Sequence, residues 1–170
     1  LQLFSSFAIL LNFPRFGKMK GMGQIVTYSI RDESLHVEAM TKLFREFIQE
    51  NIQIWTDDFK KEIYQICREM VKLEDKFLDL VFDMGDIQGL TKDDMYKYNR
   101  YIADRRLLQL GLKPNYKQSE NPLPWLDEVM GVEHQNFFEG RATTYMKAGL
   151  RGRHTNITFA DLSEDNERLF

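Results

Sequence analysis

The segment Arg31-Asp32-Glu33-Ser34-Leu35-His36 lies within a long helical pattern and contains one Glu-x-x-His pair. Residues three apart on a helix project from the same face, so Glu33 and His36 can reach a common point. A carboxylate oxygen and an imidazole nitrogen that meet at one point suit a first-row transition metal. This segment therefore predicts a helix that carries metal ligands.

The neighbours of this pair strengthen the prediction. Asp32 adds a second carboxylate to the same turn, and Arg31 can compensate the negative charge. Apolar residues at positions 30, 35 and 37 indicate partial burial, and buried charges persist mainly when they are paired or bound to metal. An isolated Glu-x-x-His also arises by chance as a solvated pair, so the spacing leaves that alternative open.

Helical periodicity dominates the chain, and strand alternation is almost absent, which predicts an all-α fold. The expected helices cover residues 1–12, 20–50, 57–84, 91–111 and 124–139. Pro14 is expected to end the first helix near Asn12, because proline disfavours helix in the residue before it. Thr56 and Thr91 are expected N-caps, and Gly85 is an expected C-terminal stop.

Composition narrows the classes of function. The net charge of −3 offers no electrostatic footprint for nucleic acid. No apolar run approaches the roughly 20 residues that a membrane helix needs. The lone cysteine, Cys67, cannot form an internal disulfide, which favours a reducing cytoplasm and a structural thiol. Arg105 and Arg106 are expected to pair with acidic residues on neighbouring helices.

The two ends of the chain carry separate expectations. The chain begins with Leu1 rather than Met, inside a helical pattern, so we expect a fragment. Residues 1–148 are expected to form a partial helical domain, and residues 149–170 a flexible tail. The last ten residues contain four acids and end in Leu169-Phe170, which suits a docking peptide as well as a solvated terminus.

Several long motifs resemble one family. Ser29-Ile-Arg-Asp-Glu-Ser-Leu-His36 closely resembles the small, radical-generating subunit of class I ribonucleotide reductase, and other stretches are similar to it too. These stretches are Leu1-Gln-Leu-Phe-Ser-Ser-Phe-Ala8, Gly17-Lys-Met-Lys-Gly-Met-Gly-Gln-Ile25, Tyr101-Ile-Ala-Asp-Arg-Arg-Leu-Leu-Gln-Leu-Gly111, Asn121-Pro-Leu-Pro-Trp-Leu126 and Val132-Glu-His-Gln-Asn-Phe-Phe-Glu139. The resemblance covers about residues 1 to 149. It implies the C-terminal portion of a ferritin-like helical bundle.

The resemblance also implies a role for each residue of the first motif. Glu33 and His36 match metal ligands of one helix. Asp32 matches an aspartate that orients a histidine ligand and takes part in proton-coupled radical transfer, as a carboxylate behind a ligating imidazole would. In ferritin-like dinuclear proteins two helices each supply a Glu-x-x-His and two others each supply a Glu. This chain holds one such motif, so the remaining ligands are expected outside it.

A dinuclear metal centre is the implied cofactor, with two irons expected and Mn/Fe or Mn/Mn pairs also compatible with these ligands. The implied activity is that of a ribonucleoside-diphosphate reductase beta subunit, an oxidoreductase that supplies the metal-radical cofactor for deoxyribonucleotide synthesis. The implied partners are the large (alpha) subunit and a second copy in a homodimer, with no nucleic acid and no membrane. The fragment alone is expected to be inactive.

Two alternatives stay open. One is another di-metal carboxylate oxidase with the same bundle. The other is a non-catalytic helical interaction module, or a remnant, that binds the large subunit through its tail. No tyrosine follows Tyr145, so the radical-relay tyrosine that the family carries in its tail has no counterpart in residues 149–170.

Overall fold

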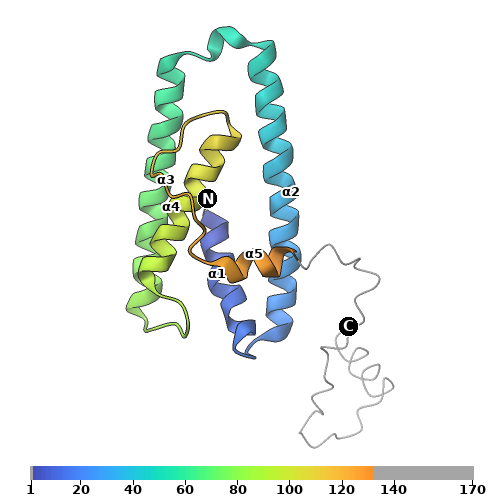
Figure 1. Ribbon diagram of the computed structural model, residues 1–170, viewed down its shortest axis with the longest axis vertical. Coiled ribbons are helices and arrows are strands. Elements are labelled where there is room, and N and C mark those ends of the chain that lie inside the picture. The colour runs from blue at the N-terminus through green and yellow to red at the C-terminus, as the bar shows by residue number, and fades with distance from the viewer. Residues whose placement is uncertain (1, 132–170) are drawn as a thin grey trace, which may run out of the picture. The chain divides into compact units, whose positions relative to one another are not determined.

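The computed structural model describes residues 2–131, and these residues are all-α, as the sequence predicts (Figure 1). The helices are α1 (Gln2–Arg15), α2 (Lys20–Glu50), α3 (Asp57–Asp83), α4 (Lys92–Gln109) and α5 (Pro124–Gly131), with a short 3-10 turn, η1 (Ile52–Ile54), between α2 and α3. Residues 132–139, the boundary at residue 148 and the expected tail, residues 149–170, lie outside the described part of the chain.

The two long helices, α2 and α3, run antiparallel and are joined through η1 (Figure 1). α1 packs on α2, α4 packs on α3, and α1 also contacts α3 and α4. The main core gathers apolar side chains from these helices and from the α5 region, and its buried members include Phe7, Ile30, Leu78, Met95, Ile102 and Leu126. No helix within residues 2–131 combines the length and the apolar character that a membrane span requires.

Capping residues set the boundaries of α3 and α4 as predicted. The Thr56 hydroxyl accepts the Phe59 N–H at 3.2 Å, and the Thr91 hydroxyl accepts the Asp94 N–H at 3.1 Å. Each bond satisfies one of the N–H groups that a helix start leaves without an intrahelical partner. Gly85, just after α3, has a φ of +133°, a conformation that L side chains rarely adopt.

The predicted end of the first helix near Asn12 is wrong. α1 continues to Arg15 with Pro14 inside its last turn. There the missing N–H costs a single hydrogen bond, and packing compensates, because Pro14 lies against Gly23 of α2. A Cβ atom at Gly23 would approach Pro14 Cγ to 2.2 Å, so glycine at this position permits the close contact.

A buried carboxylate holds the connection between α4 and α5. Asp104 is 3% exposed and accepts the N–H groups of Asn115, Tyr116 and Gln118 at 2.7, 2.9 and 2.8 Å. Three charge-assisted hydrogen bonds explain how a charged side chain is tolerated at this depth. They fix the irregular segment that leads to α5.

Candidate metal centre

α2 brings Glu33 and His36 together on one side of the helix. The Glu33 Oε2 atom lies 3.7 Å from His36 Nδ1. The two side chains come from positions three apart on an uninterrupted helix, so their convergence follows from helix geometry alone. A carboxylate oxygen and an imidazole nitrogen, both donors that suit iron or manganese, are therefore available on the same side.

The partial burial expected around this pair is only partly present. Ile30 is buried, at 1% exposure, and Val37 is half-buried, whereas Leu35 is 56% exposed. The side chain of Glu33 is 36% exposed and that of His36 is 70% exposed. The expectation is wrong for Leu35 and His36, because within residues 2–131 no helix covers the face of α2 on which they lie.

α2 has two apolar faces, and only one is covered by the described residues. Gly23, Val26, Ile30 and Ile48 form its buried face. The second face, here called the uncovered α2 stripe, follows helical spacing and consists of Ile25, His36, Met40, Leu43 and Phe47. Its four apolar members are 51% to 66% exposed. An isolated exposed leucine is ordinary, but four exposed apolar side chains on one helix face, three of them within residues 40–47, indicate a surface that something else covers.

Asp32 and Arg31 are both exposed on the same turn. Arg31 makes no ion pair with Asp32 or Glu33 within the described chain, so the expected charge compensation is absent there. Among residues 2–131 the Asp32 carboxylate likewise accepts no hydrogen bond from another side chain. It is therefore available to a donor from elsewhere.

The ligand set of a complete centre is not present in the described part of the chain. Within it, no three or more His, Cys, Asp or Glu side chains gather closely enough to hold a metal ion. Glu33 and His36 fit the donor chemistry of a dinuclear carboxylate site, but they make up only part of the donor set that such a site needs.

Sequence reasoning missed one buried acid. Glu74 of α3 is 2% exposed, its Oε1 atom has no hydrogen-bond partner, and burial raises its pKa. It lies beside Ser5 and next to Asp75, which forms a two-pronged ion pair with Arg100 at 2.7 Å. The signal was available, because Glu74 occupies the same register as the buried residues Cys67, Val71 and Leu78.

The prediction that Arg105 and Arg106 pair with acids is wrong. Arg105 donates to the Tyr101 hydroxyl at 3.1 Å, and Arg106 donates to Gln109 Oε1 at 2.8 Å. Neither guanidinium takes part in an ion pair within residues 2–131. Both partners lie on α4 itself, so pairing within one helix replaces the expected pairing between helices.

Cys67 is buried at 7% exposure, which agrees with a structural thiol.

Comparisons with known proteins agree with the resemblance in the motifs. The model of the family "Ribonucleotide reductase, small chain" matches residues 1–122. A probable ribonucleoside-diphosphate reductase small subunit of invertebrate iridescent virus 3 is 46% identical over 154 residues, which are 89% of this chain and 41% of that protein. The ribonucleoside-diphosphate reductase subunit beta of Chlamydia pneumoniae is 39% identical over 147 residues, 86% of this chain and 42% of that protein.

Solved structures give the same result for the fold. A ribonucleotide reductase subunit from Clostridium botulinum superposes with a TM-score of 0.72 at 29% identity, covering 75% of this chain and 40% of that one. A putative class I ribonucleotide reductase from Bacillus halodurans superposes with a TM-score of 0.71 at 30% identity, covering 75% of this chain and 45% of that one. The chain thus spans about two fifths of the length of the curated relatives named above.

Proposed function

Because the chain belongs to the family of ribonucleotide reductase small chains, we propose that it provides one half of the dinuclear metal centre of a radical-generating subunit. In this proposal Glu33 and His36 are metal ligands, and Asp32 accepts a hydrogen bond from a histidine ligand. The complete subunit would supply the oxidising equivalent that ribonucleoside-diphosphate reductase uses to make deoxyribonucleotides. The substrate would bind to the large subunit.

The observation that carries the proposal is the place of His36 on the uncovered α2 stripe, with Glu33 one helical turn before it. His36 shares this face with four apolar residues that are more than half exposed, and its Nδ1 atom lies 3.7 Å from Glu33 Oε2. A histidine that stays in solvent needs no apolar residues on its helix face. A metal ligand does need them when other helices of a bundle pack over that face. The exposure of His36 therefore supports a site that additional helices complete.

The remaining ligands would come from the part of the small subunit that this chain does not span. Two donors cannot hold two metals that together need six protein ligands in the family pattern. When bound, the metals would supply one-electron oxidising power through reaction with O2. The role of Glu33 and His36 would be to fix one side of the pair, and iron suits these donors, as Mn/Fe or Mn/Mn pairs also do.

Asp32 would act through a histidine rather than on the metal. A ligating imidazole usually donates its second N–H to a carboxylate, which fixes the ring and its tautomer. Asp32 immediately precedes Glu33 on α2, and its side chain is exposed. An imidazole on a helix that covers this face can therefore reach it. Held in this way, the Asp32 carboxylate would also accept and return a proton during radical transfer.

The proposed assembly includes a large subunit and a second copy of the small subunit, in the cytoplasm. The acidic and apolar peptide Asp161–Phe170 would dock on the large subunit. It lies outside the residues that the structure describes, so the support for this docking is its composition.

The test uses a chimera in which this chain follows the N-terminal portion of the iridescent virus 3 relative, which is 46% identical to it. We expect His36→Ala to lose stable occupancy of one metal position, measured as metal per subunit. Glu38→Gln on the same helix is the matched control, since Glu38 pairs with Lys42 at 2.6 Å, and it should keep both metals. Unchanged metal stoichiometry in His36→Ala would defeat the assignment.

Asp32→Ala in the same chimera separates the two proposed roles. We expect it to keep more of the metal than of the turnover with the large subunit, because its carboxylate contacts a ligand and no metal. Equal loss of both would show a structural role for Asp32. If the chimera binds no metal although circular dichroism shows that it folds, the non-catalytic interaction module becomes the better description.

A further inference from the structure

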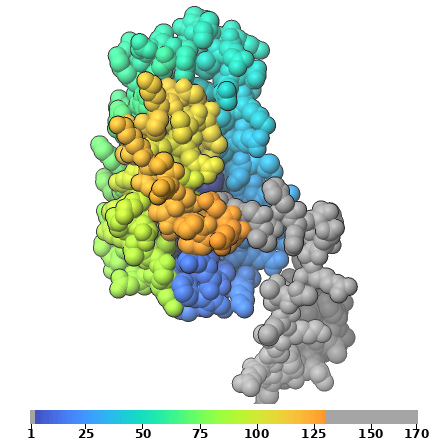
Figure 2. All heavy atoms as spheres, in the orientation of Figure 1, coloured from blue at the N-terminus to red at the C-terminus, as the bar shows by residue number. Residues whose placement is uncertain are grey.

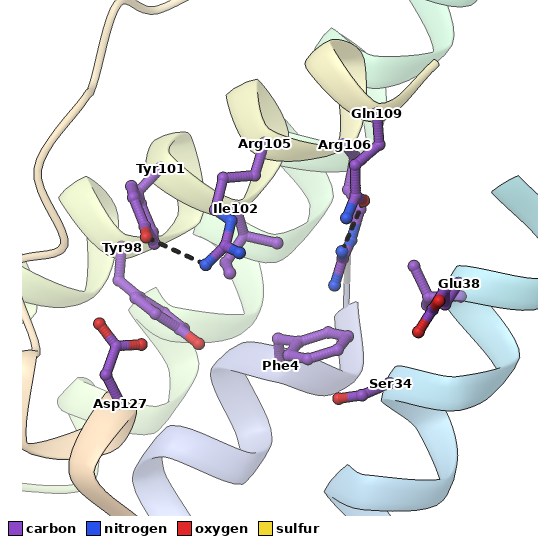
Figure 3. A pocket seen from close by; sticks show the side chains of 11 residues that line it. Phe4, Ser34, Glu38, Tyr98, Tyr101, Ile102, Arg105, Arg106, Gln109 and Asp127 are labelled. Carbon is purple, nitrogen blue, oxygen red and sulfur yellow. Dashed lines mark hydrogen bonds between the residues drawn. The ribbon is translucent and has the colours of Figure 1, made fainter. Parts of the chain in front are cut away.

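A cavity of about 300 Å³ lies between α1, α2, α4 and α5, and neither Glu33 nor His36 lines it. Figure 2 shows this face of the molecule hollowed between α4, α5 and α2. The walls mix charged, hydroxyl and apolar side chains, and Figure 3 shows most of them. They are Phe4, Ser34, Val37, Glu38, Tyr98, Tyr101, Ile102, Arg105, Arg106, Gln109 and Asp127.

Two guanidinium groups dominate one wall. Arg105 and Arg106 are adjacent on α4, and their only hydrogen bonds to side chains within residues 2–131 go to the neutral partners Tyr101 and Gln109. The Arg106 guanidinium also lies 4.7 Å from the centre of the Phe4 ring. Burial and the nearby positive charge of Arg105 lower the pKa of Arg106. Two neighbouring cations that form no ion pair within residues 2–131 favour an anion between them.

The acids of the cavity are already engaged. Glu38 forms an ion pair with Lys42 at 2.6 Å, and Asp127 accepts a hydrogen bond from Asn121 at 2.7 Å. In Figure 3 these two carboxylates stand at opposite sides of the cavity, Asp127 beside the Tyr98 ring and Glu38 on α2. Neither carboxylate forms an ion pair with Arg105 or Arg106.

An unpartnered hydroxyl provides independent evidence for a ligand. Tyr98 is 1% exposed, and its hydroxyl has no hydrogen-bond partner. Burial raises the pKa of Tyr98, so the hydroxyl keeps its proton at neutral pH and can donate. In Figure 3 it points into the cavity, toward the side on which Phe4 lies. A buried polar group without a partner is unusual in a folded protein, and a bound acceptor would satisfy it.

We infer that this cavity binds a phosphate group, with Arg105, Arg106 and the Tyr98 hydroxyl as donors to its oxygens. Phosphate has several acceptor oxygens and two negative charges near neutral pH, which match two guanidinium forks and a third donor better than a single carboxylate does. The group can be inorganic phosphate or the head of a phosphate monoester whose organic part lies along Phe4, Val37 and Ile102. The inference goes beyond the proposed metal centre and does not depend on it.

Isothermal titration calorimetry of the protein with three probes tests the site: inorganic phosphate, phenyl phosphate and benzoate. We expect both phosphate probes to bind. Phenyl phosphate should bind more tightly than inorganic phosphate if the natural ligand is a monoester. Inorganic phosphate should bind at least as tightly as phenyl phosphate if the natural ligand is free phosphate. Benzoate has the same ring and a single carboxylate. Benzoate binding as tight as that of phenyl phosphate, or no binding of either phosphate probe, would overturn the inference.

Variants assign the binding to the cavity. Arg105→Gln and Arg106→Gln should each weaken phosphate binding about tenfold or more, because each removes a charge-assisted hydrogen bond. Arg68→Gln, at an exposed position on α3 outside the cavity, is the charge-matched control and should bind as the parent does. Equal weakening in the control, or none in both cavity variants, would contradict the site.

Tyr98→Phe keeps the ring and removes only the hydroxyl, so it tests the third donor without disturbing the packing. We expect severalfold weaker phosphate binding and unchanged far-ultraviolet circular dichroism. This variant also keeps the inference testable if Arg106→Gln does not fold. Unchanged phosphate affinity in Tyr98→Phe together with unchanged affinity in Arg105→Gln would overturn the inference.

Discussion

α4 and α2 differ in how far the described residues cover them. Seven of the 18 residues of α4 are buried, and they include the polar side chains Asn99 and Asp104. Only four of the 31 residues of α2 are buried, although apolar side chains occur around much of its circumference. α4 has its neighbours within residues 2–131, whereas much of the apolar surface of α2 has no neighbour among those residues. The candidate metal ligands lie on α2, the helix that the described residues cover less.

Asp104→Ala should have the largest effect, since it removes the side chain that α4 uses to hold its neighbouring segment. We expect a loss of about 4 kcal/mol in the free energy of unfolding, because three N–H groups lose a charged acceptor. Urea unfolding followed by circular dichroism measures it. Asp93→Ala is the control on α4, since Asp93 is exposed and pairs with the exposed Lys97, and its effect should be far smaller. Similar effects of both variants would contradict the role of Asp104.

The two faces of α2 can be compared directly. Ile30→Ala on the buried face should cost about 3 kcal/mol in the chain itself, as expected for a truncated core side chain. Leu43→Ala on the uncovered α2 stripe should change the unfolding free energy of this chain by less than about 0.5 kcal/mol. In the chimera that restores a complete small subunit, the cost of Leu43→Ala should rise to about 2 kcal/mol. If it stays near zero there, the stripe is not an internal surface of the subunit.

Glu74 gives a small effect that depends on pH. Because burial raises its folded-state pKa, the folded protein holds this proton more tightly than the unfolded chain does. The associated stability is present below the unfolded pKa of about 4.3 and is lost as pH rises through the folded pKa. We expect Glu74→Gln to remove this dependence and to stabilise the protein by about 1 kcal/mol at pH 7. Unfolding curves between pH 4 and pH 8 would test it, and a parallel pH dependence in the parent and the variant would contradict it.

Local signals account for the parts of the fold that were predicted correctly. The bounds of α2 and the caps of α3 and α4 depend on residues close in sequence, such as Thr56 and Thr91, whose hydroxyls bond to backbone groups three residues later. The convergence of Glu33 and His36 is local too, because one helical turn separates them. These features needed no knowledge of tertiary packing.

The errors occur where distant segments meet. Pro14 stays inside α1 because α2 presents a glycine to it, and the pattern around Asn12 carries no sign of that contact. Arg105 and Arg106 have neutral partners because the acids opposite them, Glu38 and Asp127, are engaged elsewhere. Which charges end up as neighbours depends on how the helices pack.

By itself, the sequence determined that the chain is helical, where its long helices begin, and that a carboxylate and an imidazole share one turn of α2. These are short-range properties set by backbone hydrogen bonding, capping and the 3.6-residue period. Only the tertiary structure decided which apolar faces are buried, that Glu74 and the Tyr98 hydroxyl lie in the interior without full partners, and that two arginines meet at a cavity. Burial and charge pairing are decided by residues far apart in the chain, because side chains from several helices have to pack into the same space.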